Sequence, residues 1–164
     1  MIAFIKDCTK TVQMNGAQLH LSLNHLPVVI SIIALGILAW GWFCKNSDIK
    51  KVGLVLVIAA AGFAGAAFLT GEPAEEVIEK MPIFSEELVH AHEEAGEAAL
   101  IVSIVAGIGA LASLFLSKKK EQLASYAFAV TFFVLVLSSI AFLRTAHLGG
   151  LIHHEEIRSE TSNP

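Results

Sequence analysis

Charged residues are scarce in this chain of 164 residues. They make up 16% of the sequence against 55% hydrophobic residues, and the mean hydropathy is +0.68. A soluble domain of this size carries about a quarter charged residues, so we expect most of the surface to face lipid. The formal net charge is −4, and no stripe of lysine or arginine suggests nucleic acid as a partner.

Cysteine is also scarce, and the motifs of familiar enzyme classes are absent. The two cysteines, Cys8 and Cys44, do not form a CxxC pair, and the topology argued below places them on opposite sides of a membrane. The sequence contains no nucleophile motif, phosphate-binding loop or dinucleotide fingerprint. We therefore expect neither a disulfide framework nor an enzyme of one of these classes.

Long apolar runs dominate what is present. A helix needs roughly 20 residues to cross a hydrocarbon core of about 30 Å, and within lipid its backbone must satisfy its own hydrogen bonds. The sequence therefore predicts an all-α, integral membrane four-helix bundle, a single domain over residues 1–164 that is surrounded by the lipid bilayer. Four runs meet the required length: residues 26–44, 52–70, 98–116 and 123–143.

The connections between these runs predict the orientation. Residues 45–51 and 117–122 are short and rich in lysine, whereas residues 71–97 hold nine glutamates and one lysine. The positive-inside rule places the lysine-rich connections in the cytoplasm. The acidic loop and both termini are then extracytoplasmic, and Trp40, Trp42 and Phe43 form an aromatic anchor at the inner face.

The outer side is expected to hold further short elements. The segment 1–19 can hold a short interfacial helix, in which residues 2–14 place Ile5, Cys8 and Val12 on one face and Asn15-Gly16 is the stop. The alternative is a frayed tail. We predict a short helix over residues 73–80, and a third spanning helix that is capped by Ser85 and rises well above the membrane. Small residues four apart predict close contact between the second and third spans: Ala61/Gly65, Gly62/Ala66 and Ala106/Ala110.

The seven histidines are confined to the outer side, and most of the acids accompany them. At about 1.5 Å of rise per residue, His25 and Glu97 lie near the outer boundary of the hydrocarbon, and other histidines lie just beyond it. Side chains from the first, third and fourth spans can therefore converge at the outer mouth of the bundle. The histidines are His20, His25, His90, His92, His147, His153 and His154.

Two kinds of ligand suit such a cluster. Two imidazoles from facing helices can hold a b-type haem. The first candidates for these ligands are His25 and His147, and the next are His20, His90 and His92. Arg144 is the candidate partner for a haem propionate. Imidazole with carboxylate instead suits zinc, iron or copper; the candidates are His25, His90, Glu97, His147 and His154. The alternatives are that the histidines and acids are solvated surface residues and that Arg144 snorkels to the interface.

One segment resembles a bacterial membrane family. His20-Leu-Ser-Leu-Asn-His25-Leu-Pro27 is similar to the HPxxxHFP opening of domain-of-unknown-function family 2231, with Leu21 in place of the first proline. Weaker matches follow at Thr70-Gly71, at His90-Ala-His92 and at residues 149–153. The resemblance covers residues 20–157 and implies four spans in a bacterial cytoplasmic membrane, with a role in electron transfer by association with cytochrome or Rieske modules.

These observations lead to two hypotheses about function. The first is a membrane redox protein that binds b-type haem, or a transition-metal ion, at its extracytoplasmic end and exchanges electrons with respiratory subunits or a periplasmic electron carrier. The second is a cofactor-free accessory subunit that packs against other membrane proteins through its small residues. Self-association is compatible with both hypotheses, and a transporter is disfavoured because the spans carry only serines at mid-depth.

Overall fold

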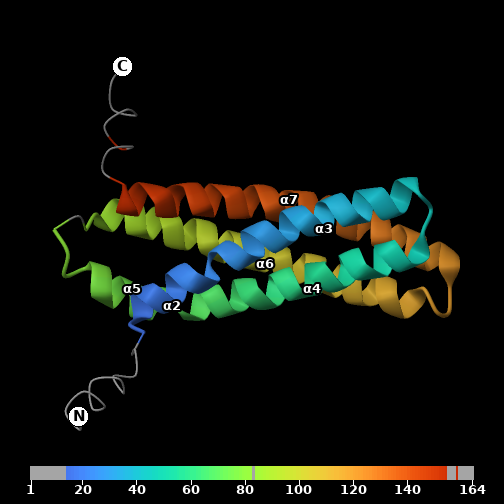
Figure 1. The fold of residues 1–164 in the computed structure, drawn as a ribbon, viewed down its shortest axis with the longest axis horizontal. Coiled ribbons are helices and arrows are strands. Elements are labelled where there is room, and N and C mark those ends of the chain that lie inside the picture. The colour runs from blue at the N-terminus through green and yellow to red at the C-terminus, as the bar shows by residue number, and fades with distance from the viewer. Residues whose placement is uncertain (1–13, 83, 155–157, 159–164) are drawn as a thin grey trace, which may run out of the picture.

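The computed structural model describes residues 14–82, 84–154 and 158, and within these residues the chain is almost entirely helical (Figure 1). Four helical segments are long and apolar enough to cross a membrane, counting α2 with α3 and α4 with α5. The all-α four-helix architecture is therefore confirmed. The helices are α2 (Gly16–Leu23), α3 (His25–Phe43), α4 (Ser47–Leu69), α5 (Gly71–Ile78), α6 (Glu86–Leu116) and α7 (Glu121–His153).

The spanning helices begin earlier or end later than the hydropathy pattern predicts. Helix α4 starts at Ser47 because the side chain of Asn46 accepts hydrogen bonds from the backbone N–H of Asp48 and Ile49, at 2.9 and 3.1 Å. Helix α6 starts at Glu86, more than three turns before the apolar run, as expected for a helix that rises above the membrane. Ser85 occupies the predicted N-cap position of α6, but its side chain makes no capping hydrogen bond.

Two short helices, α2 and α5, lie side by side at one end of the bundle (Figure 1). Asn15 starts α2 through a capping box, in which the side chains of Asn15 and Gln18 each accept from the other's backbone N–H. The prediction that Asn15 and Gly16 end a helix is therefore wrong, because this capping box makes them the start of α2. Residues 16–19 of the expected interfacial segment belong to α2, and residues 1–13 lie outside the described part. A Cβ on Gly16 would collide with the backbone carbonyl of Pro73, so this glycine allows α2 to approach α5 closely.

Helices α2 and α3 are separated by a single residue, Asn24. Pro27 explains the break, because its ring clashes with the carbonyl group four residues earlier, which is that of Leu23, the last residue of α2. Asn24 keeps helical dihedral angles, φ −65° and ψ −23°, so the chain continues toward the membrane without a loop. His20 therefore sits on a separate segment from His25.

The core is built from small side chains that let the helices approach closely. Between α4 and α6, a Cβ on Gly107 would lie 3.1 Å from the Cβ of Ala61, which confirms the contact predicted between these helices. Gly62 and Gly65 take no part in it, since no described atom lies within 4 Å of a Cβ at either position. The buried apolar residues form two clusters. One contains Ala34, Leu38, Leu54, Val57, Ala106, Ala110 and Leu135, and the other contains Ala64, Ala99 and Phe142.

The bundle has two chemically different ends. The start of α2, the end of α7 and helix α5 share one end, and the two lysine-rich turns share the other (Figure 1). Large apolar side chains cover the outer surface between them, and Trp40 and Phe43, next to the first lysine-rich turn, are 63% and 81% exposed. This pattern suits a protein surrounded by lipid, with aromatic rings near one membrane surface.

Candidate functional site

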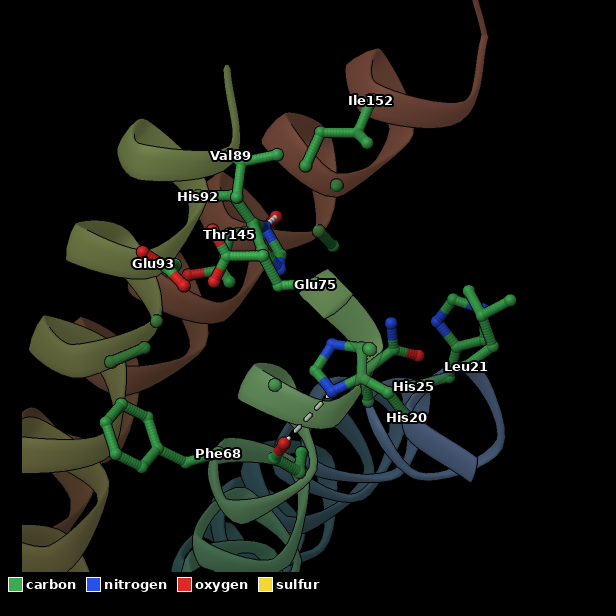
Figure 2. A pocket seen from close by; sticks show the side chains of 18 of the residues that line it. His20, Leu21, His25, Phe68, Glu75, Val89, His92, Glu93, Thr145 and Ile152 are labelled. Carbon is green, nitrogen blue, oxygen red and sulfur yellow. Dashed lines mark hydrogen bonds between the residues drawn. The ribbon is translucent and has the colours of Figure 1, made fainter. Parts of the chain in front are cut away.

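A cavity of about 780 Å³ opens at the α2–α5 end of the bundle (Figure 2). Its volume lies within the range of about 300–1,000 Å³ that is common for small-molecule sites. One wall comes from α2, the start of α3, α5 and the end of α4, and the opposite wall comes from α6 and α7. Phe142, together with Ala64 and Ala99, lies on its membrane side.

His20 projects into the cavity from α2. Its Nδ1 lies 3.0 Å from the carbonyl oxygen of Ala67 and 3.1 Å from the hydroxyl oxygen of Thr70. A backbone carbonyl can only accept, so Nδ1 carries the proton and donates it to this pair. Thr70 also donates its own hydroxyl hydrogen to Ala67, at 2.8 Å, which fixes the acceptor in place. The Nε2 atom of His20 remains available to a ligand.

His92 projects from α6 and is held in the same way. Its Nδ1 donates to the carbonyl oxygen of Thr145 on α7, at 2.9 Å. The ring can approach α7 because residue 149 is glycine: a Cβ there would lie 3.1 Å from Cε1 of His92. A Cβ on the next residue, Gly150, would meet no described atom within 4 Å.

The two imidazole rings lie on opposite walls of the cavity. Their centroids are 6.3 Å apart and their planes are nearly perpendicular, at 84°. Figure 2 shows that the nitrogen not used in the backbone hydrogen bond is turned, in both rings, toward the space between them. Both histidines are half-buried, whereas the other described histidines are exposed.

Carboxyl groups surround His20 and His92. The carboxyl groups of Glu75 on α5 and Glu93 on α6 lie close to each other beside His92 (Figure 2). Among the described residues, the lining contains no lysine or arginine. The acids that line the cavity are Glu72, Glu75, Glu93, Glu94 and Glu97.

The remaining sequence-predicted residues are placed differently. His25, His90, Glu97 and His154 line the cavity but are exposed, and the Nδ1 of His90 lies 3.8 Å from a carboxylate oxygen of Glu94. His147 and Arg144 are exposed and lie outside the lining. Helix geometry explains the position of His147. Thr145 and Gly149 face His92 of α6, and His147 is two residues from each of them, so its side chain points away from α6.

These placements bring together two of the haem candidates, His20 and His92, but not the first pair, His25 and His147. In the described ranges, no three histidine, cysteine, aspartate or glutamate side chains are arranged to hold a metal ion, so the proposed metal set does not converge there. The binding roles of His25 and His147 stay predictions. Sequence reasoning missed the roles of Thr70, Thr145 and Gly149, although the residue pairs Thr70-Gly71 and Gly149-Gly150 stood out in the resemblance.

Comparisons with known proteins give no relative from which the role of this site could be inferred. No protein-family model matches the chain, and no curated protein and no solved structure is similar to it. The resemblance to family 2231 accordingly stays a prediction.

Proposed function

We propose that this membrane protein binds one b-type haem between His20 and His92 and transfers electrons at the α2–α5 end of the bundle. The observation that carries the proposal is the pair of half-buried imidazoles, which come from opposite walls of one cavity and direct their second nitrogens toward each other. Two facing histidines on different helices are a common way to hold haem in a helical bundle.

The spacing of the rings supports a shared ligand. Two imidazoles that bind one metal from opposite sides are separated by two metal–nitrogen bonds of about 2.0 Å each and two ring radii of about 1 Å, or about 6 Å between centroids. The observed separation is 6.3 Å. Perpendicular ring planes are compatible with this arrangement, because each ring can rotate about its own metal–nitrogen bond.

The backbone hydrogen bonds support the same interpretation. A metal-binding histidine usually donates its other ring N–H to a carbonyl or carboxylate, which fixes the tautomer and the ring orientation. His20 and His92 both make this bond, to Ala67 and Thr145 respectively. Each ring is thereby preorganised with an unprotonated Nε2 when the imidazole is neutral.

The cavity also suits the body of a porphyrin, with one restriction. Phe68, Phe142 and Ile152 provide apolar lining, and the volume is adequate for a ligand of that size. No lysine or arginine in the described part of the lining offers a counter-charge to propionates, so these groups would have to extend into water. The surrounding glutamates favour a cation, and therefore the oxidised iron, which would lower the reduction potential.

Haem, when bound, supplies reversible one-electron chemistry. The chain's own contribution is to hold two imidazoles at a fixed separation, to shield the site from the membrane side with Phe142, and to surround it with negative charge. A metal ion alone is less well supported, since no group of three suitable side chains is found among the described residues. The cofactor-free accessory subunit is the alternative that a colourless protein would favour.

The decisive experiment is a dithionite-reduced minus oxidised absorption spectrum of the detergent-purified protein, with haem and metal analysis on the same sample. We expect Soret and α bands at about one haem per chain. His20→Ala and His92→Ala should each abolish the bands. His147→Ala is the matched control and should keep them, because His147 is exposed and lies outside the cavity lining.

Three results would contradict the proposal. A colourless wild-type protein after haem supplementation would exclude haem and leave the accessory-subunit hypothesis. Retention of the bands in both His20→Ala and His92→Ala would show that haem is bound elsewhere. Loss of the bands in His147→Ala with retention in His92→Ala would return the ligand role to the pair first predicted from the sequence.

A further inference from the structure

Lys50 occupies an unusual position at the lysine-rich end, far from the histidine cavity. A Cβ on Gly41 of α3 would lie 2.9 Å from the backbone nitrogen of Lys50 and 3.0 Å from its Cγ, so the lysine stem starts close against α3. Its ammonium nitrogen lies 5.0 Å from the centroid of the Phe128 ring on α7. The side chain thus reaches from α4 to α7 and is half-buried.

An aromatic row continues from this contact across the surface of the bundle. Phe128 stacks with Phe132 at a centroid distance of 6.5 Å, and Phe132 contacts Trp42 of α3 at 6.0 Å. Lys50 and these three rings form what we call the Lys50 cluster. Trp42 is 57% exposed, so the row ends on the surface that the lipid covers.

The charge of Lys50 lies against an aromatic ring. Within residues 14–82, 84–154 and 158, no carboxylate lies within ion-pair distance of its ammonium, and its contact is with the Phe128 ring. The neighbouring Lys51, by contrast, is paired with Asp48 at 2.8 Å. A partly buried charge is costly unless it is paired, and a ring face compensates only part of that cost.

We propose that the Lys50 cluster binds an anionic phospholipid, with the phosphate on the Lys50 ammonium and an acyl chain along Trp42. Lys50 lies two residues before the predicted hydrocarbon-spanning run 52–70, which places it at headgroup depth. The surrounding end is strongly basic, and such segments attract anionic lipid at about 1 kcal/mol per lysine. The lysines here are Lys45, Lys50, Lys51, Lys118, Lys119 and Lys120, against Asp48 and Glu121.

Native mass spectrometry tests this proposal. The delipidated full chain in detergent is mixed with equal amounts of phosphatidylglycerol and phosphatidylcholine that carry the same acyl chains. We expect one phosphatidylglycerol to be retained preferentially. Lys50→Gln should lower its retention about fivefold, equivalent to about 1 kcal/mol when 1.4 kcal/mol is a factor of ten.

Lys51→Gln is the matched control, because it removes the same charge from the adjacent residue but leaves Lys50 and the rings unchanged. The charge of Lys51 is already paired with Asp48, so this variant should retain phosphatidylglycerol nearly like the wild type, and Lys50→Arg should do the same. Circular dichroism of each variant establishes that the helices are intact. These measurements involve no histidine and no haem, so their outcome is independent of the proposed function.

Three outcomes would overturn the proposal. Equal retention of the two lipids by the wild type would show that no anionic headgroup is selected. Equal losses in Lys50→Gln and Lys51→Gln would show diffuse attraction by the whole basic end. Displacement of phosphatidylglycerol by millimolar inorganic phosphate would show that the cluster is a site for free phosphate rather than for lipid.

Discussion

Replacing Gly149 by alanine measures how much the close approach of His92 to α7 matters. A methyl group at this position would lie 3.1 Å from Cε1 and 3.4 Å from Nδ1 of His92. The ring would have to move by a few tenths of an ångström, and this movement would lengthen or break its 2.9 Å hydrogen bond to Thr145. Gly150 is the matched control, because a methyl group there meets no described atom within 4 Å.

The magnitude follows from two opposing terms. Alanine is more favourable than glycine in a helix by about 0.8–1.0 kcal/mol, so Gly150→Ala should stabilise α7 by an amount of that order. Gly149→Ala gains the same term but loses a hydrogen bond that contributes about 0.5–1.5 kcal/mol. We therefore expect the Gly149 variant to be less stable than the Gly150 variant by about 1 kcal/mol.

The assay is thermal unfolding of both variants in the same detergent, together with the reduced-minus-oxidised spectrum. Gly149→Ala should also weaken the Soret band, since the displaced ring directs Nε2 away from the shared ligand position. Identical unfolding temperatures and identical spectra for the two variants would refute the argument that the glycine is required by the His92 ring.

Three further substitutions test other parts of the fold and site. Gly16→Ala should lower the unfolding temperature in detergent because a Cβ there collides with the Pro73 carbonyl, whereas Gly71→Ala, with open space around it, should not. Thr70→Val removes one of the two acceptors of the His20 N–H, so it should weaken haem binding by about 0.5–1.5 kcal/mol. Thr70→Ser keeps the hydroxyl group and should bind haem like the wild type. Equal haem binding by the two variants would contradict a role of Thr70 in positioning His20. Asn46→Ala should cost about 1 kcal/mol of stability in a denaturation series, because two backbone N–H groups lose their cap, and an unchanged midpoint would argue against it.

The spanning helices were predictable because lipid imposes one simple requirement. Every residue within the hydrocarbon must be apolar or internally satisfied, so the length of each run alone locates a helix. The start of α6 at Glu86 could also be expected, since Ser85 followed by two glutamates is a typical helix N-terminus. The start of α4 was missed because the cap at Asn46 lies outside the apolar run.

The site was only partly predictable, because it depends on how each helix is rotated about its axis. Sequence spacing shows that His90 and His92 face opposite ways but not which of them faces α7; the contact of His92 with Gly149 decides this. The break at Asn24 likewise separates His20 from His25 and lets the two histidines differ in burial. Interhelical packing sets the first feature, and a single sequence does not reveal it. The break at Asn24 follows from Pro27 and is visible in the sequence, but the burial of His20 that results is not.

The division of the cavity walls between the two halves of the chain has a consequence for assembly. His20, Ala67 and Thr70 belong to the first helical hairpin, and His92 and Thr145 belong to the second. Neither hairpin alone holds both His20 and His92. A molecule held by both histidines would therefore bind only after the hairpins have docked, and its binding free energy would be added to the stability of that docked state. The fraction of protein with bound ligand would then measure the fraction in which the two hairpins have docked.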